Sequence, residues 1–313
     1  MFSTTIIPTV GRKTLERAVQ SVLNQNFSHD EYEVIVVNDS GRPLSHEDWQ
    51  NSPRVRIVNT NHRERCIARN VGAALANGRY LHFLDDDDWL LPDALENLWK
   101  LARANPQGAW LYGGAVVYDR DDRPVTRLIH DLGPNCFVQA MAGEWIPLQA
   151  SFIHHEKFHL VGGFSPLIPG VEDIDLTRKM ARRFDFVGTP DLIAGVEFGA
   201  LGSTTNRAKA LLDGREAREL ILEESGVSER LWQSATTAYW RGRIVRVYWT
   251  SAVLNFMRRR PLRALSRMLY GLRALLRSAL TSLLSREFWK AILGPHESEA
   301  FLRGHEERQS SSA

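Results

Sequence analysis

Cysteines and long apolar runs are scarce in this sequence of 313 residues. The two cysteines, Cys66 and Cys136, stand 70 positions apart, which excludes a disulfide framework and a paired-cysteine metal site and is typical of a reducing compartment. No uncharged apolar segment approaches the roughly 20 residues that a transmembrane helix needs. No signal peptide is expected, because Phe2 to Ile7 already have the pattern of a first strand.

Two common nucleotide-binding loops are also missing. The sequence has neither a G-x-x-x-x-G-K-[ST] phosphate loop nor a G-x-G-x-x-G turn, which excludes a P-loop protein and a dinucleotide-binding protein of the usual kind. The loop after the first strand, Pro8 to Lys13, lacks the glycine-rich pattern that a nucleotidyltransferase making sugar nucleotides requires.

Charge is distributed unevenly behind a net charge of +2. Residues 1–237 carry 25 Lys and Arg against 32 Asp and Glu, a net of −7. Residues 238–293 carry 12 basic residues against the single Glu287, a net of +11, and the last twenty residues have a net of −2. This asymmetry indicates two regions with different partners.

A carboxylate cluster follows an apolar run near the middle of the acidic region. Residues 80–84 (YLHFL) have the pattern of a buried strand, and Asp85 to Asp88 follow directly. Adjacent carboxylates repel one another and resist desolvation, so a cluster at a strand end favours a bound cation. Hard oxygen ligands suit Mn²⁺ or Mg²⁺, usually together with substrate phosphates. The alternative is a solvated acidic turn, against which the flanking Leu84 and Trp89 argue.

Strands and helices alternate along the region before residue 205. Short apolar runs that end in polar loops predict strands over residues 4–7, 33–37, 54–59, 80–84, 110–118, 125–129 and 147–154. Apolar residues at helical spacing predict helices over 14–25, 70–76 and 92–105, and a further helix from 172. This pattern indicates an α/β fold with a mainly parallel sheet that binds ligands at the carboxyl ends of its strands.

Six motifs occur in a fixed order between residue 3 and about residue 205. They are I-I-P-T-x-G-R, V-I-V-V-N-D-S-G, A-R-N-x-G with A-x-G-R-Y, F-L-D-D-D-D-W-L-x-P-D, V-G-G-F-S and E-D-I-D-L. In this order and spacing they resemble the family 2 glycosyltransferases, inverting enzymes with the GT-A fold. The resemblance implies a Rossmann-like GT-A catalytic domain over residues 1–205, followed by a helical region over 206–293. The tail, 294–313, is expected to be disordered.

The resemblance implies that one group of residues binds the donor nucleotide. Asp39 would accept hydrogen bonds from uracil or another base, and Pro8, Thr9 and Arg12 would line the same pocket. Arg69 would bridge the diphosphate or the base, although an arginine in a basic loop is about as often part of a surface ion pair.

The acids of the motifs would serve the metal and the acceptor. Asp85 would face the ribose, and Asp87 would bind the metal on the diphosphate. Asp86 matches the variable middle position of the D-x-D pattern and would also lie at the nucleotide sugar, while Asp88 is an extra acid. Asp173 matches the general base.

Sugar transfer from a nucleoside diphosphate needs a cation that stabilises the charged leaving group. It also needs a carboxylate that takes the proton of the attacking hydroxyl, and a single base with in-line attack gives inversion. Many relatives carry a histidine in the stretch that matches residues 197–205, where it can contact the metal. No histidine occurs there, so water or a residue elsewhere would replace it, and with water Asp87 would be the one protein ligand.

The basic C-terminal region contains an amphipathic pattern. Ser228 is expected to cap a helix over 229–259, and a second helix is expected over 261–285. In the second helix Arg263, Arg267, Arg273 and Arg277 fall within about 120° of one another, opposite a leucine face. This arrangement is typical of a helix lying in the plane of an anionic membrane surface. The alternatives are packing on the catalytic domain and a seam between copies, that is, a homo-oligomer.

The sequence therefore predicts a metal-dependent inverting glycosyltransferase of the hexosyltransferase type. Its donor would be a nucleoside-diphosphate sugar of the UDP type, and its acceptor a glycan or lipid-linked intermediate of surface polysaccharide. The protein is expected in the cytoplasm, peripheral on the inner face of the membrane, with no nucleic-acid partner. The alternative from another class is a catalytically silent nucleotide-sugar-binding or scaffold subunit, which the intact Asp39, Asp85, Asp87 and Asp173 weigh against.

Overall fold

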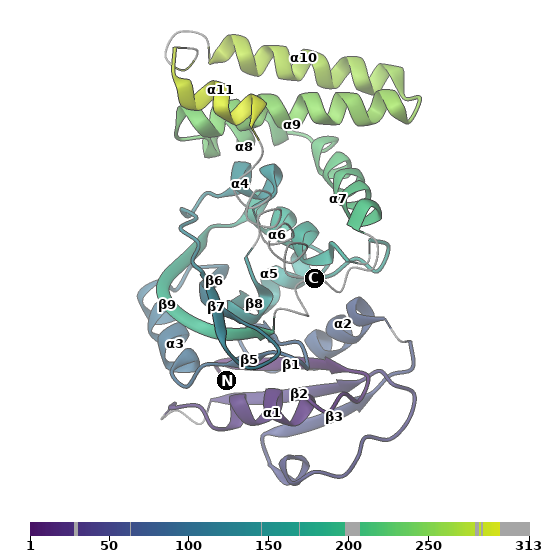
Figure 1. The fold of residues 1–313 in the computed structure, drawn as a ribbon, viewed down its shortest axis with the longest axis vertical. Coiled ribbons are helices and arrows are strands. Elements are labelled where there is room, and N and C mark those ends of the chain that lie inside the picture. The colour runs from purple at the N-terminus through teal and green to yellow at the C-terminus, as the bar shows by residue number, and fades with distance from the viewer. Residues whose placement is uncertain are drawn as a thin grey trace. The chain divides into compact units, whose positions relative to one another are not determined.

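The computed structural model describes residues 1–27, 31–62, 64–144, 146–168, 170–197, 207–278, 282 and 284–294. These residues form two compact units (Figure 1). The first unit comprises Met1–Asn135 and Ile146–Ala210, and the second comprises Cys136–Trp145 and Leu211–Ala313. The boundary predicted at residue 205 and the tail from 295 to 313 lie outside the described residues.

A nine-stranded sheet forms the first unit, with strand order β3-β2-β1-β4-β8-β6-β9-β5 and with β7 paired to β6. Its N-terminal half is parallel and consists of β1 (Ser3–Thr9), β2 (Tyr32–Asn38), β3 (Val55–Asn59) and β4 (Tyr80–Phe83). All seven residues of β2 are buried, as expected for a central strand of a sheet covered on both faces. The predicted α/β class is therefore confirmed.

Beyond β4 the sheet is mixed rather than parallel. These strands are β5 (Trp89–Leu90), β6 (Trp110–Tyr118), β7 (Pro124–Leu128), β8 (Ser151–His154) and β9 (Phe186–Glu197). β8 runs antiparallel to both of its neighbours, β4 and β6, whereas β6 and β9 are parallel. The sequence did not predict β9, because Gly188, Pro190 and Gly195 interrupt its apolar pattern.

The short β5 fixes the far end of the carboxylate loop. β5 pairs with β9, and Trp89 lies opposite Gly195. A Cβ atom at Gly195 would lie 2.3 Å from the Trp89 ring, so this close approach requires glycine. Residues 84–88 are thus held by sheet strands on both sides, by β4 before them and β5 after them.

The first unit also contains helices, namely α1 (Leu15–Leu23), α2 (Arg65–Leu75), α3 (Ala94–Ala104), α5 (His155–Leu160) and α6 (Glu172–Arg183). It has two 3-10 turns as well, η1 (Asp48–Asn51) and η2 (Leu148–Ala150). α2 begins five residues before the start predicted at 70. The reason is a cap, since the Glu64 carboxylate accepts hydrogen bonds from the backbone N–H of Cys66 at 3.0 Å and Ile67 at 2.8 Å. The run of polar residues before 70 is therefore helical.

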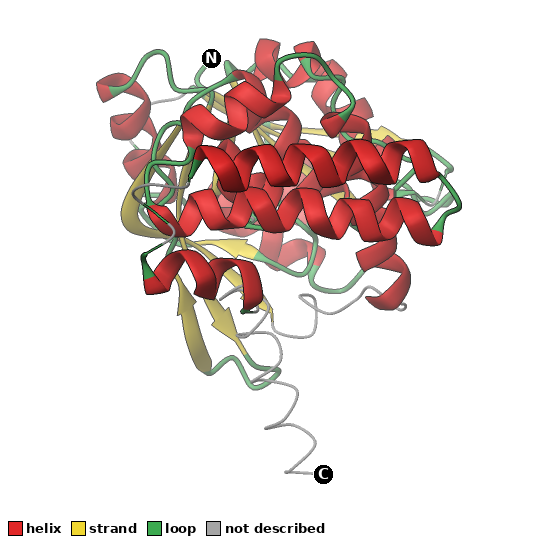
Figure 2. Ribbon diagram, turned by 90° about the horizontal axis from the view of Figure 1, so that it is seen from above, coloured by secondary structure: helices red, strands yellow, loops and turns green. Residues whose placement is uncertain are grey.

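The second unit is helical. It contains α4 (Phe137–Ala142), α8 (Val227–Ser234), α9 (Ala238–Met257), α10 (Pro261–Arg277) and α11 (Arg286–Leu293), together with most of α7 (Arg207–Leu222). α9 and α10 lie side by side as a helical hairpin, and α11 also packs on α9 (Figure 1; Figure 2). No helix among the described residues is both long enough and apolar enough to cross a bilayer.

The helix predicted over 229–259 is in fact two helices, α8 and α9. Thr237 caps α9 by accepting a hydrogen bond from the Trp240 N–H at 3.4 Å, and this cap separates the two helices. Ser228 does not cap α8, because its hydroxyl instead hydrogen-bonds the Tyr248 hydroxyl at 2.6 Å. Of the helix predicted over 261–285, α10 accounts for the part up to Arg277.

A buried polar cluster holds α7, α9 and α10 together. Glu219, only 2% exposed, accepts hydrogen bonds from Asn255 Nδ2 at 2.8 Å, from Arg267 Nε at 3.2 Å and from the Ser251 hydroxyl. A buried carboxylate needs such partners, since removing one of them leaves an uncompensated charge. Arg267 therefore serves the interior of the unit rather than its surface.

Candidate functional site

Three neighbouring parallel strands bring the predicted polar residues to one edge of the sheet. Thr9 ends β1, Asp39 follows β2, and Asp85 comes two residues after β4. The Asp39 N–H donates to the Thr9 carbonyl oxygen at 2.8 Å, so two of these strand ends are in contact. β1 continues through Pro8, where the sequence predicted its end, and the half-buried Pro8 is in register with Val37. Ligands bind at this edge in open α/β sheets.

Three of the four consecutive carboxylates converge. One oxygen from each of Asp85, Asp87 and Asp88 lies within 4.8 Å of the others. Asp88 is fully buried and accepts hydrogen bonds from Gln149 Nε2 at 2.6 Å and from the Glu197 N–H at 3.0 Å. Burial, reinforced by Asp85 and Asp87, raises the pKa of Asp88 well above its ordinary value. Asp88 is thus engaged in hydrogen bonds inside the protein, whereas Asp85 and Asp87 are partly accessible to solvent.

Arg12 lies on the carboxylate cluster. Its Nη1 atom is 2.6 Å from Asp87 Oδ2 and 3.0 Å from Asp86 Oδ1. The Thr9 hydroxyl donates to Asp86 Oδ2 at 2.5 Å. The sequence assigned Thr9 and Arg12 to the base pocket, whereas the structure brings both side chains to the carboxylates. Burial and the charge of Asp85 raise the pKa of Asp87 to about 6, although Arg12 opposes this shift.

The donor set of this cluster fits a divalent cation. All its ligand atoms are carboxylate oxygens, which suit Mg²⁺ or Mn²⁺. The Asp87 side chain keeps 20% exposure, and its only charged partner among the described residues is Arg12, itself 49% exposed. The Asp85 side chain is more exposed, at 30%, but its partner Arg69 is buried, so Asp87 is the acid whose counter-ion is easier to displace by a metal. The stretch where related enzymes can carry a histidine lies, beyond Glu197, outside the described residues.

Asp39 organises the loop that leads into α2. Its buried carboxylate accepts hydrogen bonds from the Thr60 hydroxyl at 2.7 Å, the His62 N–H at 2.7 Å and the Glu64 N–H at 2.6 Å. These three donors belong to the loop between β3 and α2, which Asp39 therefore holds against the end of β2. The loop contacts also fix the orientation of the Asp39 carboxylate.

Arg69 joins the carboxylate cluster to the start of α6. The buried guanidinium donates to Asp85 Oδ1 at 2.5 Å and to Glu172 Oε1 at 3.0 Å, and Arg65 Nε lies 2.8 Å from the same Glu172 oxygen. Burial alone would raise the pKa of Asp85, but the Arg69 charge holds it below its ordinary value. The alternative that Arg69 forms a surface ion pair is therefore wrong, because Arg69 is buried and links Asp85 to Glu172. Glu172 was missed as a site residue, although it stands beside Asp173 in the last motif.

Asp173 lies in the first turn of α6, next to this link. The Ile174 N–H donates to Asp173 Oδ1 at 2.7 Å, and Arg69 is close enough to interact electrostatically with Asp173. Burial and the neighbouring Glu172 raise the pKa of Asp173 to about 6. Asp173 is half-buried rather than sealed inside the protein. A carboxylate of this pKa is ionised at neutral pH and is a stronger base than an ordinary aspartate.

The pKa of Asp173 predicts how activity depends on pH. Below a pH of about 6 the Asp173 carboxyl is protonated and cannot accept a proton; if it is the base expected from the sequence, the rate of sugar transfer should fall about tenfold per pH unit. Above this value the rate should reach a plateau. The measurement is initial rate against pH at saturating Mn²⁺ and donor, which keeps Asp87 occupied. A rate that stays constant down to pH 4.5 would contradict the assignment.

The chain is similar to known proteins over about half of its length. The sequence model of Glycosyl transferase family 2 matches residues 4–168. An uncharacterised glycosyltransferase of Haemophilus influenzae is 28% identical over 186 residues, which cover 58% of this chain and 62% of that protein. The GalNAc(5)-diNAcBac-PP-undecaprenol beta-1,3-glucosyltransferase of Campylobacter jejuni is 33% identical over 119 residues, 36% of this chain and 37% of that protein. The chain thus spans less than two thirds of these curated relatives.

A solved structure is similar over most of the chain. It is Staphylococcus aureus TarS in complex with UDP-GlcNAc, which superposes with a TM-score of 0.57 and covers 89% of this chain and 81% of that one. The sequence identity is 14%, so the likeness concerns the fold. It extends beyond the sheet unit, because 89% of the chain includes helices of the C-terminal region.

Proposed function

Because the chain belongs to glycosyl transferase family 2, and is therefore a glycosyltransferase, we propose that it transfers a sugar from a UDP-sugar with inversion. A Mn²⁺ or Mg²⁺ ion held by Asp87 would bind the diphosphate, and Asp173 would act as the general base. One observation carries the proposal: Arg69 links the carboxylate cluster to the α6 turn that presents Asp173. The carboxylates proposed for the diphosphate and the carboxylate proposed for the acceptor hydroxyl are thereby held near one buried guanidinium, that of Arg69.

Each residue has a task in this reaction. Asp39 would orient the base, while the loop hydrogen bonds keep its carboxylate fixed. Asp85, held by Arg69, lies on the ribose side of the cluster. When bound, the divalent cation would neutralise charge that develops on the diphosphate. Asp173 takes the proton of the acceptor hydroxyl as it attacks the anomeric carbon from the face opposite the diphosphate, which inverts that carbon.

The acceptor is proposed to be a glycan or a lipid-linked intermediate of surface polysaccharide, at the inner face of the cell membrane. The Campylobacter jejuni relative acts on an undecaprenol-linked substrate by its name, which supports this class. The basic helical unit supports a peripheral position at an anionic surface, because residues 211–293 carry 15 Lys and Arg against 7 Asp and Glu.

A two-step assay tests the proposal. Nucleotide sugars are first screened by thermal shift with Mn²⁺, where a donor at 100 times its Kd should stabilise the protein by about 2.7 kcal/mol. The donor that binds is then tested for Mn²⁺-dependent hydrolysis and transfer. If a nucleotide sugar binds but is neither hydrolysed nor transferred, the protein would instead be a catalytically silent subunit. Failure of every nucleotide sugar to stabilise the protein at millimolar concentration would overturn the donor site.

A further inference from the structure

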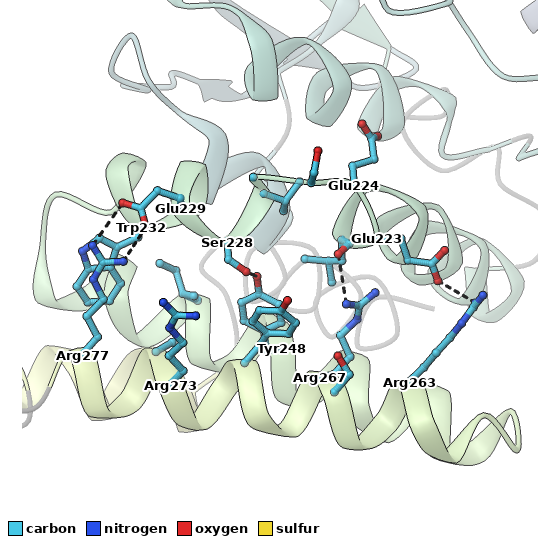
Figure 3. Close-up of a pocket in the computed structure, with 18 of the residues that line it drawn as sticks. Glu223, Glu224, Ser228, Glu229, Trp232, Tyr248, Arg263, Arg267, Arg273 and Arg277 are labelled. Atoms are coloured by element: carbon cyan, nitrogen blue, oxygen red, sulfur yellow. Dashed lines mark hydrogen bonds and ion pairs between the residues drawn. The ribbon is translucent and has the colours of Figure 1, made fainter.

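The helical unit contains a cavity of about 630 Å³. α10 forms one wall, and the end of α7 with the start of α8 forms the other (Figure 3). Four arginines of α10 line it, namely Arg263, Arg267, Arg273 and Arg277. Aromatic side chains complete it, with Tyr248 and Tyr270 stacked at 5.4 Å and Trp232 beneath Arg277. This cavity lies wholly within the second unit and shares no residue with the donor site.

Three of the four arginines already have acidic partners. Each ion pair joins α10 to the opposite wall, at 2.8 Å for Arg263 with Glu223, 3.2 Å for Arg267 with Glu219 and 2.9 Å for Arg277 with Glu229. These pairs stabilise the walls of the cavity, and they leave the three guanidinium groups engaged.

Arg273 is different. Among the described residues it makes no hydrogen bond or ion pair, and its side chain extends from α10 into the cavity (Figure 3). Glu229, with which Arg273 interacts electrostatically, is already bound by two nitrogens of Arg277, and both arginines lower the pKa of Glu229. Glu224 points away from α10 in the same view. Arg273 is exposed at the rim of the cavity, and an arginine whose five N–H donors have no protein partner in the described part of the chain is suited to an oxyanion such as phosphate.

An exposed apolar face adjoins the cavity. It comprises Leu262, Leu265, Leu269, Leu272 and Leu276, whose exposure ranges from 46% to 82%. Phe256 and Met257, at the turn between α9 and α10, are also more than 70% exposed. On a helix of 100° per residue the five leucines span about 80°, and Arg273 follows about 20° beyond Leu262. Arg273 thus stands at the border between the apolar face and the cavity.

We propose that the leucine face of α10 contacts the acyl chains of a bilayer while the cavity binds the phosphate of an anionic phospholipid through Arg273. The proposal rests on the proposed function, since it specifies how the enzyme reaches a membrane-linked acceptor. A leucine face bordered by arginine matches the depth profile of a membrane surface, with apolar groups below the phosphates. The net positive charge of the unit favours an anionic bilayer over a second, equally positive copy of the chain.

This arrangement differs from the one that the sequence suggested. The four arginines were expected to form one basic face of a helix in the plane of an anionic membrane, whereas three of them are paired with Glu219, Glu223 and Glu229. Binding should therefore depend on one arginine and on the leucines more than on the summed charge.

Vesicle flotation of the full chain tests the proposal. The protein should bind vesicles with 30% phosphatidylglycerol and bind pure phosphatidylcholine vesicles more weakly. Arg273→Gln should weaken binding to the anionic vesicles about fivefold, the value of one basic residue near the surface. The matched control is Arg286→Gln, which removes the same charge from an exposed position outside the cavity and should change binding less than twofold. Leu269→Gln with Leu272→Gln should weaken binding to both kinds of vesicle.

Several outcomes would overturn the proposal. Equal losses for Arg273→Gln and Arg286→Gln would indicate diffuse charge attraction without a site. Stabilisation by glycerol 3-phosphate, without any vesicle binding, would assign the cavity to a soluble phosphate ester. A lipid-free dimer that the double leucine variant dissociates would assign the face to a second copy. Donor binding is measured separately by thermal shift. A lack of vesicle binding would therefore not argue against the donor site, and a lack of donor binding would not argue against the lipid site.

Discussion

Replacing Asp173 by Asn should lower the rate of sugar transfer about 10²–10⁴-fold, the usual cost of losing a general base. Asparagine preserves the size of the side chain and can still accept the hydrogen bond from the Ile174 N–H, but it cannot take a proton. Donor affinity should barely change, because Asp39 and Asp87 are untouched. The measurement is turnover with the true acceptor, together with the Kd of the UDP-sugar in the presence of Mn²⁺.

The competing interpretation of Asp173 is structural. Acidic residues in the first turn of a helix complement its dipole, and Asn caps a helix about as well as Asp. In that case Asp173→Asn would keep nearly parental turnover, and the base would have to be sought elsewhere. A matched control is Asp175→Asn, which makes the same chemical change two residues further along α6. Asp175 is paired with Lys179 at 2.5 Å, so its replacement should affect stability rather than transfer.

Asp87→Ala should abolish the Mn²⁺-dependent part of nucleotide diphosphate binding. Asp87 is paired with the exposed Arg12, whereas Asp85 is held by the buried Arg69 and Asp88 by Gln149. The acids that remain in the variant are therefore already engaged by other partners. Calorimetric titration of UDP with and without Mn²⁺ should show a clear difference for the parent and none for the variant.

A control for the Asp87 variant lies close by in the chain. Asp93→Ala removes one carboxylate from an exposed position, where the Asp93 side chain accepts a hydrogen bond from Asn26 Nδ2 at 3.1 Å. Its Mn²⁺-dependent affinity for UDP should equal that of the parent. If Asp87→Ala also bound UDP with parental Mn²⁺ dependence, Asp87 would not be a metal ligand.

The sequence predicted the fold class, the family and the strand-end position of the acids, and these predictions are confirmed. They depended on local patterns, such as the apolar run before Asp85. The contacts that define the site could not be predicted in this way. Arg69 and Glu172 are 103 positions apart, and Arg12 and Asp87 are 75 positions apart. No periodicity links such pairs, because only the folded sheet brings them together.

The same reason explains the remaining differences in the helical unit. The α10 arginines pair with glutamates of α7, of the turn that follows it and of α8, and these pairs depend on which helix faces meet. From the sequence alone, arginines on one face of an amphipathic helix cannot be distinguished from arginines committed to ion pairs. The site roles of Pro8, Thr9, Arg12, Asp39 and the acids remain predictions that the variants above can test.

The contact of Arg12 with Asp86 and Asp87 implies that the carboxylates carry their own counter-ion. If Asp87 binds the metal as proposed, uptake would exchange one cation for another, and the affinity for Mn²⁺ alone would include the work of displacing the guanidinium. Once displaced, Arg12 is a free cation at the place where the diphosphate arrives. Metal and nucleotide should consequently load in synergy, each binding more tightly in the presence of the other by the same factor.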